Sequence, residues 1–406
     1  MDEARALNMR LVGYHDLEKR PAFKLALQVV DGRWYLYTSQ FWCSGWSILD
    51  VTDPSRPEFV KFVEGPENTW TLQVQVAEGK MITSLERIFS EEWGHDPTKP
   101  FFEGIYTWDV SEPREPRRLS QFKTGHLGTH RNYYDGGGYV HCAAAARGYG
   151  GLIYRIVDIQ DPERPVEAGR WALPEQWTAG GGKPSGPYVS LHGPPYVEGD
   201  RAYLSYGSAG MVILDISDLS VPKLVSRLDV GPALGSWLGC HTVVPYPSRK
   251  LAVINGEAIN EDCDEPVNYT CVVDLSNEAN PRVISLFPIP VPPEGAPYRN
   301  FCQKGGRFGP HNQHHPQHHP DLESRDDRIY LTYFNAGLRV YDLTDPYLPR
   351  EIGWYVPPDP KERLGLLPKK LVCQTEDVLV DRRGYIYITD KNWGIHILEF
   401  TGDGGR

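Results

Sequence analysis

The sequence has no run of 18 apolar residues, so no membrane-spanning helix is expected. Basic residues are in the minority, with 42 Lys and Arg against 53 Asp and Glu. The net charge of -11 argues against a nucleic-acid binder, which needs a basic face to displace counterions, and against anionic membranes. The N-terminal residues are charged and lack the apolar segment of a signal peptide. We therefore expect a cytoplasmic protein that binds neither nucleic acid nor membranes.

Several motifs are also missing. The seven cysteines are odd in number and form no CxxC pair, which argues against a disulfide framework or a zinc ribbon. We expect most of them to be small buried residues in strands. The sequence has no P-loop, no dinucleotide-binding fingerprint and no nucleophile elbow. A nicotinamide enzyme and a serine hydrolase are therefore not expected.

Turn-forming residues, by contrast, are abundant. The chain has 35 prolines and 40 glycines, and 12% of its residues are aromatic. This composition, without long helical patterns, is typical of many short strands joined by tight turns. One phrase recurs, in which an apolar strand ends in aspartate and a proline-containing turn follows. The anchor residues are Asp50, Asp109, Asp158, Asp215, Asp274 and Asp342, with Glu399 in a seventh copy.

The repeat predicts the fold. Two further strand-like runs precede each phrase, and another short strand follows it, so each unit has four strands. Four strands in a period of roughly 50 residues are the signature of a β-propeller blade. The seventh unit stops after its third strand, and residues 9–14 resemble the missing outer strand. We therefore predict one all-β domain over residues 1–406, a seven-bladed propeller closed by its N-terminal strand.

The repeated phrases also resemble a known family. The segments WSILDVTDP (46–54), MVILDISDL (211–219) and LRVYDLTDP (338–346) are similar to the repeats of the LVIVD-repeat β-propellers. The resemblance extends from about residue 8 to residue 400. It implies the propeller fold and leaves the function open.

Histidines recur at matched positions in this repeat. His130 precedes residue 141 by 11 residues, His192 precedes residue 203 by 11, and His241 precedes residue 252 by 11. Each lies where the innermost strand of its blade should begin, near the central channel. In blade six the segment GPHNQHHPQHHP (309–320) has a longer hairpin loop, and His314 or His315 falls at the equivalent place. His311 comes just before it, and Glu376 occupies the matched position in blade seven.

The matched histidines predict a metal site. Four neutral imidazoles can hold one divalent ion, and the candidate ligands are His130, His192, His241 and one of His314 or His315. We favour Fe(II), with Zn(II), Cu(II) or Mn(II) as alternatives. The other interpretation is that these histidines are satisfied residues of the propeller core.

Carboxylates near the channel are candidates for catalysis. Glu86, Glu257 and Asp390 end the second strands of their blades, where they would hold a ligand imidazole or form salt bridges at the rim. We expect Glu376 to orient a ligand histidine or to act as a general base. Aromatic residues in long loops on the same face are expected to wall an apolar cavity. These are Trp93, Phe101, Phe102, Trp177, Trp237, Phe308 and Trp393.

These features predict a metal-dependent enzyme whose substrate is an apolar or aromatic small molecule. The plan of four channel histidines is similar to that of the carotenoid-cleavage oxygenases, which hold non-haem Fe(II) with four histidines. By this analogy of architecture, we favour an oxygenase-type oxidoreductase, with Glu376, Glu257 and Glu86 as the catalytic candidates. Two alternatives remain: a hydrolase or lyase that uses the ion as a Lewis acid, and a non-catalytic propeller that binds protein partners.

Overall fold

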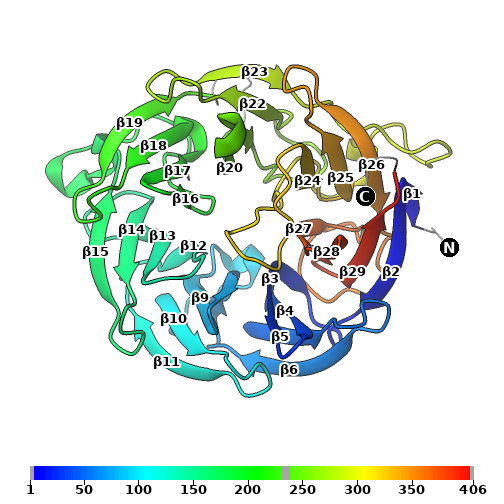
Figure 1. The fold of residues 1–406 in the computed structure, drawn as a ribbon, viewed down its shortest axis with the longest axis horizontal. Helices are drawn as coiled ribbons and strands as arrows, with labels where there is room; N and C mark the ends of the chain where they lie inside the picture. Colours follow the sequence, from blue (N-terminus) through cyan, green and yellow to red (C-terminus); the bar gives the residue numbers. More distant parts are fainter. Residues whose placement is uncertain (1–3, 231–237, 403–406) are drawn as a thin grey trace.

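The computed structural model describes residues 4–230 and 238–402. Its strands form seven sheets arranged as blades around a central axis, as Figure 1 shows. The protein is therefore a seven-bladed β-propeller, and the predicted all-β fold is confirmed. Within each blade, neighbouring strands are antiparallel, and the sheet extends from the axis to the outer edge.

The bounds of the strands are as follows. Blade one contains β3 (Ala22–Val30), β4 (Arg33–Gln40), β5 (Gly45–Asp50) and β6 (Glu58–Glu64). Blade two contains β7 (Thr69–Trp70), β8 (Val74–Ala77), β9 (Lys80–Arg87), β10 (Gly104–Asp109) and β11 (Arg117–Phe122). Blade three contains β12 (Thr129–Tyr133), β13 (Tyr139–Ala145), β14 (Leu152–Asp158) and β15 (Val166–Trp171). Blade four contains β16 (Tyr196–Glu198), β17 (Arg201–Ser205), β18 (Met211–Asp215) and β19 (Lys223–Leu228).

Blade five contains β20 (Thr242–Tyr246), β21 (Leu251–Asn255), β22 (Thr270–Asp274) and β23 (Arg282–Leu286). Blade six contains β24 (Arg328–Thr332), β25 (Leu338–Asp342), β26 (Arg350–Val356) and β1 (Arg5–Leu7). Blade seven contains β27 (Thr375–Val380), β28 (Tyr385–Asp390), β29 (Gly394–Phe400) and β2 (Met9–His15). The short helices are η1 (Glu91–Trp93), η2 (Pro174–Gln176), η3 (Thr178–Gly180), η4 (Gly207–Ala209), η6 (Pro247–Arg249) and α1 (Phe301–Lys304).

The N-terminal segment joins two blades. Strand β2 pairs antiparallel with β29, from Met9 opposite Phe400 to His15 opposite Ile395, and forms the outer strand of blade seven. Strand β1 pairs with β26 of the neighbouring blade. The two ends of the chain therefore lie side by side in Figure 1, where the blue and red strands meet.

Local sequence explains the hairpins and the repeated turns. Asp31 and Gly32 both have positive φ, 50° and 76°, as a two-residue turn of type I′ requires between β3 and β4. In the repeated phrase, the aspartate side chain accepts hydrogen bonds from the residue two positions later. Asp274 Oδ1, for example, accepts from the backbone N (2.9 Å) and the hydroxyl (2.6 Å) of Ser276. The aspartate thereby fixes the turn that leads to the outer strand.

The hydrophobic core lies between neighbouring blades. Trp46 of blade one meets Trp108 of blade two edge to face, with ring centroids 5.6 Å apart. Buried side chains of β3, β4 and β5 form one cluster with those of β8, β9 and β10. Because each blade packs against two neighbours, the inner strands are held at fixed positions around the axis.

One expectation about cysteine is wrong. Cys263 and Cys302 form a disulfide, although the number and spacing of the cysteines argued against a disulfide framework. Cys263 lies in a loop and Cys302 in the short helix α1, 39 residues apart, so sequence spacing could not pair them. Four other cysteines are buried thiols, as expected. A disulfide is more typical of oxidising compartments, and the cytoplasmic location stays a prediction. No helix among the described residues is long and apolar enough to cross a membrane.

Candidate metal centre

A row of four histidines lies where the inner strands begin, and each histidine comes from a different blade. His130 is in β12, His192 precedes β16, His241 directly precedes β20, and His311 precedes β24. Successive ring centroids are 4.4 Å, 4.9 Å and 4.9 Å apart. Blades three to six therefore bring one imidazole each to the same end of the channel.

The structure places His311 in this row, in the position expected for His314 or His315. The backbone N–H of His311 donates to Thr332 at the end of β24, just as His241 donates to Asn255 at the end of β21. The extra residues of the blade-six hairpin lie after His311, around Pro316. The prediction of His314 or His315 assumed that these residues come before the channel histidine. The prolines at 316 and 320 could have located the loop, because proline is common in turns.

His314 and His315 serve other contacts. His314 donates from Nε2 to the carbonyl of Glu323 (2.8 Å) and accepts at Nδ1 from Val380 N (3.2 Å). His315 stacks on Tyr196 with ring centroids 4.1 Å apart. Both side chains are buried, so they are satisfied core histidines of the kind considered as the alternative.

Outward hydrogen bonds fix the first two imidazoles of the row. His130 Nδ1 lies 2.7 Å from Glu86 Oε2, and His192 Nδ1 lies 2.9 Å from the Tyr188 hydroxyl. Where such a partner accepts the hydrogen bond, the proton is on Nδ1 and the Nε2 lone pair can bind a metal. Glu86 therefore lies behind a candidate ligand, as the sequence predicted.

The other two imidazoles are held in the same way. His241 Nδ1 lies 2.6 Å from the Thr242 hydroxyl, and His311 Nδ1 lies 2.8 Å from the carbonyl oxygen of Glu376. The Glu376 carboxylate is also 3.2 Å from His311 Nδ1, and it forms a buried ion pair with Lys391 at 2.8 Å. Glu376 thus lies behind His311, where it can orient the ring, and the pair with Lys391 holds it there.

The Nε2 atoms point toward one another and toward Glu257. His130 Nε2 and His192 Nε2 are 3.2 Å apart. Glu257 Oε2 is 3.3 Å from His192 Nε2 and 3.2 Å from His241 Nε2. Two atoms bound to one ion at the usual nitrogen distances lie about 3.0–3.4 Å apart, so these spacings fit a shared ion. His192, His241 and Glu257 are the only such group of metal-binding side chains among the described residues.

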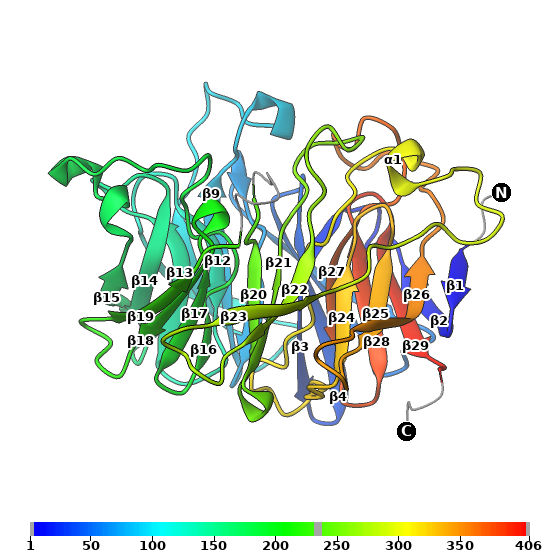
Figure 2. The same cartoon turned by 90° about the horizontal axis from the view of Figure 1, so that it is seen from above.

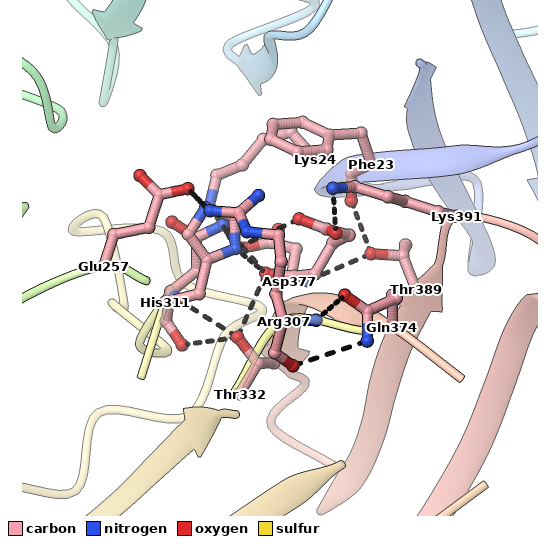
Figure 3. Close-up of polar contacts among 12 residues, drawn as sticks. Phe23, Lys24, Glu257, Arg307, His311, Thr332, Gln374, Asp377, Thr389 and Lys391 are labelled. Carbon is pink, nitrogen blue, oxygen red and sulfur yellow. Dashed lines mark hydrogen bonds and ion pairs between the residues drawn. The ribbon is translucent and has the colours of Figure 1, made fainter. Parts of the chain in front are cut away.

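The position of Glu257 differs from its expected place at the rim. It follows β21, and its carboxylate lies within the row, where Oε1 also pairs with Arg307 and is 3.6 Å from His311 Nε2. Figure 3 shows Glu257, Arg307 and His311 close together. Oε2 has no hydrogen-bond partner, although it is buried. An orphaned carboxylate oxygen beside two imidazole lone pairs is the donor set that a cation would satisfy.

Burial governs the protonation of the site. It lowers the pKa of His130 to about 3 and that of His192 to about 4, and it lowers the pKa of His241 as well. The imidazoles are therefore neutral at pH 7, which is the state that binds metal. Burial alone would raise the pKa of Glu257, but Arg307 together with the neighbouring histidines holds that pKa well below its usual range. Burial raises the pKa of Glu86 to about 8.

Asp390 stands apart from the row. Its carboxylate accepts hydrogen bonds from the backbone N–H groups of Gln374 (2.5 Å) and Asn392 (2.8 Å), so it fixes the chain around β28. Burial raises its pKa to about 7. The structure therefore gives Asp390 a role in the scaffold.

A cavity of about 130 Å³ opens beside the row. Its apolar lining includes Phe23, Phe41, Trp70, Leu72, Phe89 and Trp93. Trp93 lies here as expected. The lining does not include Phe101, Phe102, Trp177, Phe308 or Trp393, and Trp237 lies outside the described residues. The expected aromatic residues were all in long loops. Phe23, Phe41 and Trp70 were missed because they come from the ends of strands in blades one and two.

The channel is crossed on the side away from the long loops. The segment between His311 and β24, yellow in Figures 1 and 2, crosses the middle of the ring. His318 on this segment reaches Glu198 at the end of β16, with Nε2 and Oε1 3.3 Å apart. Glu198 belongs to blade four, so the segment spans the axis.

Comparisons with known proteins agree with this architecture. The LVIVD repeat matches residues 196–230, which run from β16 through β19. Together with the seven blades, this match supports the resemblance of the chain to the LVIVD-repeat β-propellers. No curated protein matches the chain.

Solved structures are similar in fold only. The β-propeller domain of Cps50 (Swd1) from Myceliophteria thermophila has 7% identity and a TM-score of 0.56, over 93% of this chain and 98% of that chain. A streptogramin B lyase has 12% identity and a TM-score of 0.53, over 96% and 97%. The computationally designed protein Ika8 has 6% identity and a TM-score of 0.52, over 96% and 99%.

Proposed function

We propose that the protein is a metal-dependent enzyme that acts on an apolar or aromatic small molecule. One divalent ion would be held by His192, His241 and Glu257, with His130 and His311 on either side. The observation that carries this proposal is the orientation of the four imidazoles. Each Nδ1 has an outward hydrogen-bond partner, and the Nε2 atoms of His192 and His241 lie 3.3 Å and 3.2 Å from Glu257 Oε2. An ion held there would take the His241 Nε2 lone pair that Arg131 Nη2 contacts at 3.2 Å.

The donor set favours Fe(II). Imidazoles suit iron, zinc and copper, and an added carboxylate is the kind of mixed nitrogen and oxygen set that non-haem iron prefers. A bound Fe(II) would supply oxygen chemistry, which makes an oxidoreductase the favoured class. Zn(II), Cu(II) and Mn(II) remain the alternatives.

The chain's own residues would bind and shield the substrate. Phe41, Trp70 and Trp93 offer an apolar surface that excludes water from the cavity. Tyr188 lines the same cavity while its hydroxyl holds His192, so it couples the substrate pocket to the row. Glu376 is not among the cavity-lining residues, and we give it a positioning role through His311.

One observation favours the hydrolase or lyase alternative. Glu86 lines the cavity, and its pKa of about 8 makes it able to hold a proton near pH 7. A carboxyl group with this property can act as a general acid or base beside a Lewis-acidic ion. Oxygen consumption separates the two classes, because a hydrolase or lyase needs no O₂.

Elemental analysis of protein purified without an affinity tag tests the proposal. We expect about one divalent ion per chain, and loss of that ion in His241→Ala with an unchanged β-sheet circular dichroism signal. His315→Ala is the matched control, because His315 is equally buried but lies outside the row. Full metal content in both His192→Ala and His241→Ala would exclude the row as the site and favour the scaffold alternative.

A further inference from the structure

Arg131 is a buried cation beside the row. It follows His130 in β12, its exposed fraction is 1%, and it lines the cavity. Its Nη2 donates to His241 Nε2 at 3.2 Å, and its Nε and Nη1 have no hydrogen-bond partner among the residues that the structure describes. A guanidinium group keeps its charge in proteins.

The carboxylates around the channel already have cations of their own. Glu257 pairs with Arg307, and Glu376 pairs with Lys391 at 2.8 Å. Each of these acids is therefore neutralised by a partner other than Arg131.

The same holds for the remaining acids near Arg131. Asp377 pairs with Lys24 at 2.7 Å, and both side chains are buried. Glu86 contacts His130, with Oε2 2.7 Å from Nδ1. Among the described residues, no carboxylate lies within ion-pair distance of Arg131. Within the part of the chain that the structure describes, the Arg131 guanidinium at the cavity therefore has no ion-pair partner.

We propose that the cavity takes an organic monoanion, a compound with an apolar or aromatic body and a carboxylate that lies against Arg131. This inference rests on the proposed function and names its substrate class. The body of the compound would contact Phe41, Trp70 and Trp93, and its charge would compensate the buried guanidinium.

The charge balance also favours a carboxylate over a phosphate. Only one cation is unmatched, whereas a phosphate monoester brings nearly two negative charges at pH 7. The Glu257 carboxylate, which pairs with Arg307, lies in the same row and would repel a second negative charge. A metal ion in the row would add positive charge and strengthen binding of the same anion.

A pair of probes tests the inference. Phenylacetate and phenylacetamide have nearly the same shape, and only the first is charged. Their binding to the full-length protein can be followed by calorimetry and by quenching of the tryptophans that line the cavity, in metal-free and metal-loaded samples. We expect the wild-type protein to prefer phenylacetate at least tenfold in both states.

Variants assign the preference to Arg131. Arg131→Met should remove the preference and leave phenylacetamide binding unchanged, and Arg131→Lys should keep part of it. Arg131→Gln carries the test if the methionine variant does not fold. Arg227→Met, which changes an arginine on the outer strand β19, should behave like the wild type.

The outcomes separate this inference from the proposed function. Failure of the wild-type protein to bind phenylacetate, or equal binding of the two probes, overturns the inference. A preference that survives in Arg131→Met and Arg131→Gln also overturns it, because another group would then supply the charge. Metal content is measured on the same samples. A protein without metal that still prefers phenylacetate through Arg131 keeps the anion site and removes the metal-dependent function.

Discussion

The outer turns of the blades resemble one another, whereas the starts of the inner strands differ. Asp109, Asp215 and Asp274 each end a third strand and accept the same hydrogen bonds from the serine two residues later. At the channel, the starts of the innermost strands carry different side chains in different blades, such as His241 in blade five and Glu376 in blade seven. Repetition therefore builds the scaffold, and departures from the repeat build the site.

Irregular strand pairing accompanies these departures. His130 lies at a register shift between Thr129 and Arg131, and Glu376 lies at one between Thr375 and Val378. A bulge redirects side chains without ending the strand. In a regular strand, the side chains at these positions would lie between neighbouring blades. The bulges allow His130 and Glu376 to reach the channel.

The largest effect is expected from breaking the scaffold. Deletion of residues 1–18 removes β1 and β2, exposes the edges of β26 and β29, and opens the ring. We expect the whole domain to lose cooperative unfolding, as measured by thermal denaturation. A shortened protein with the wild-type melting temperature would contradict the closing role of these strands.

A smaller effect is expected from Glu376→Gln, which should change both the stability of the protein and the metal affinity of the site. The change leaves the buried Lys391 without its ion-pair partner, and breaking a buried pair costs about 3 kcal/mol. It also weakens the support of His311, which should lower metal affinity or turnover about tenfold. Urea denaturation and metal titration measure the two effects separately.

The double variant Glu376→Gln with Lys391→Met is the control. It removes both charges, so we expect most of the stability to return while the metal effect remains. If metal binding returned together with stability, Glu376 would have no positioning role toward His311. Loss of the ion as complete as in His241→Ala would instead make Glu376 a ligand.

The sequence predicted the repeated parts better than the unique ones. The aspartate phrase was sufficient for the blades, and a constant spacing was sufficient for His130, His192 and His241. His311 was missed because an insertion in one hairpin shifts the alignment, and spacing does not say on which side of a histidine it falls. Glu257 and Arg131 take their roles from contacts between blades, which no single repeat encodes. The Cys263–Cys302 disulfide likewise joins a loop to helix α1 across segments that no repeat relates.

The smallest effect is expected at a single outer turn. Hydrogen bonds from Ser276 lower the pKa of Asp274 to about 2, with a further contribution from Arg282. A carboxyl group with a lowered pKa in the folded state stabilises the protein above its unfolded pKa of about 3.9, and this contribution disappears as the pH falls toward 2. Because the carboxylate lies at an outer turn and its partner Arg282 is exposed to solvent, which screens the charge, we expect Asp274→Asn to cost only about 1 kcal/mol at pH 7. Urea denaturation should show this difference from the wild type above about pH 4 and a shrinking difference below it, with metal content unchanged at pH 7. A difference that is constant from pH 7 to pH 2 would mean that the turn depends on the shape of the side chain and not on its charge.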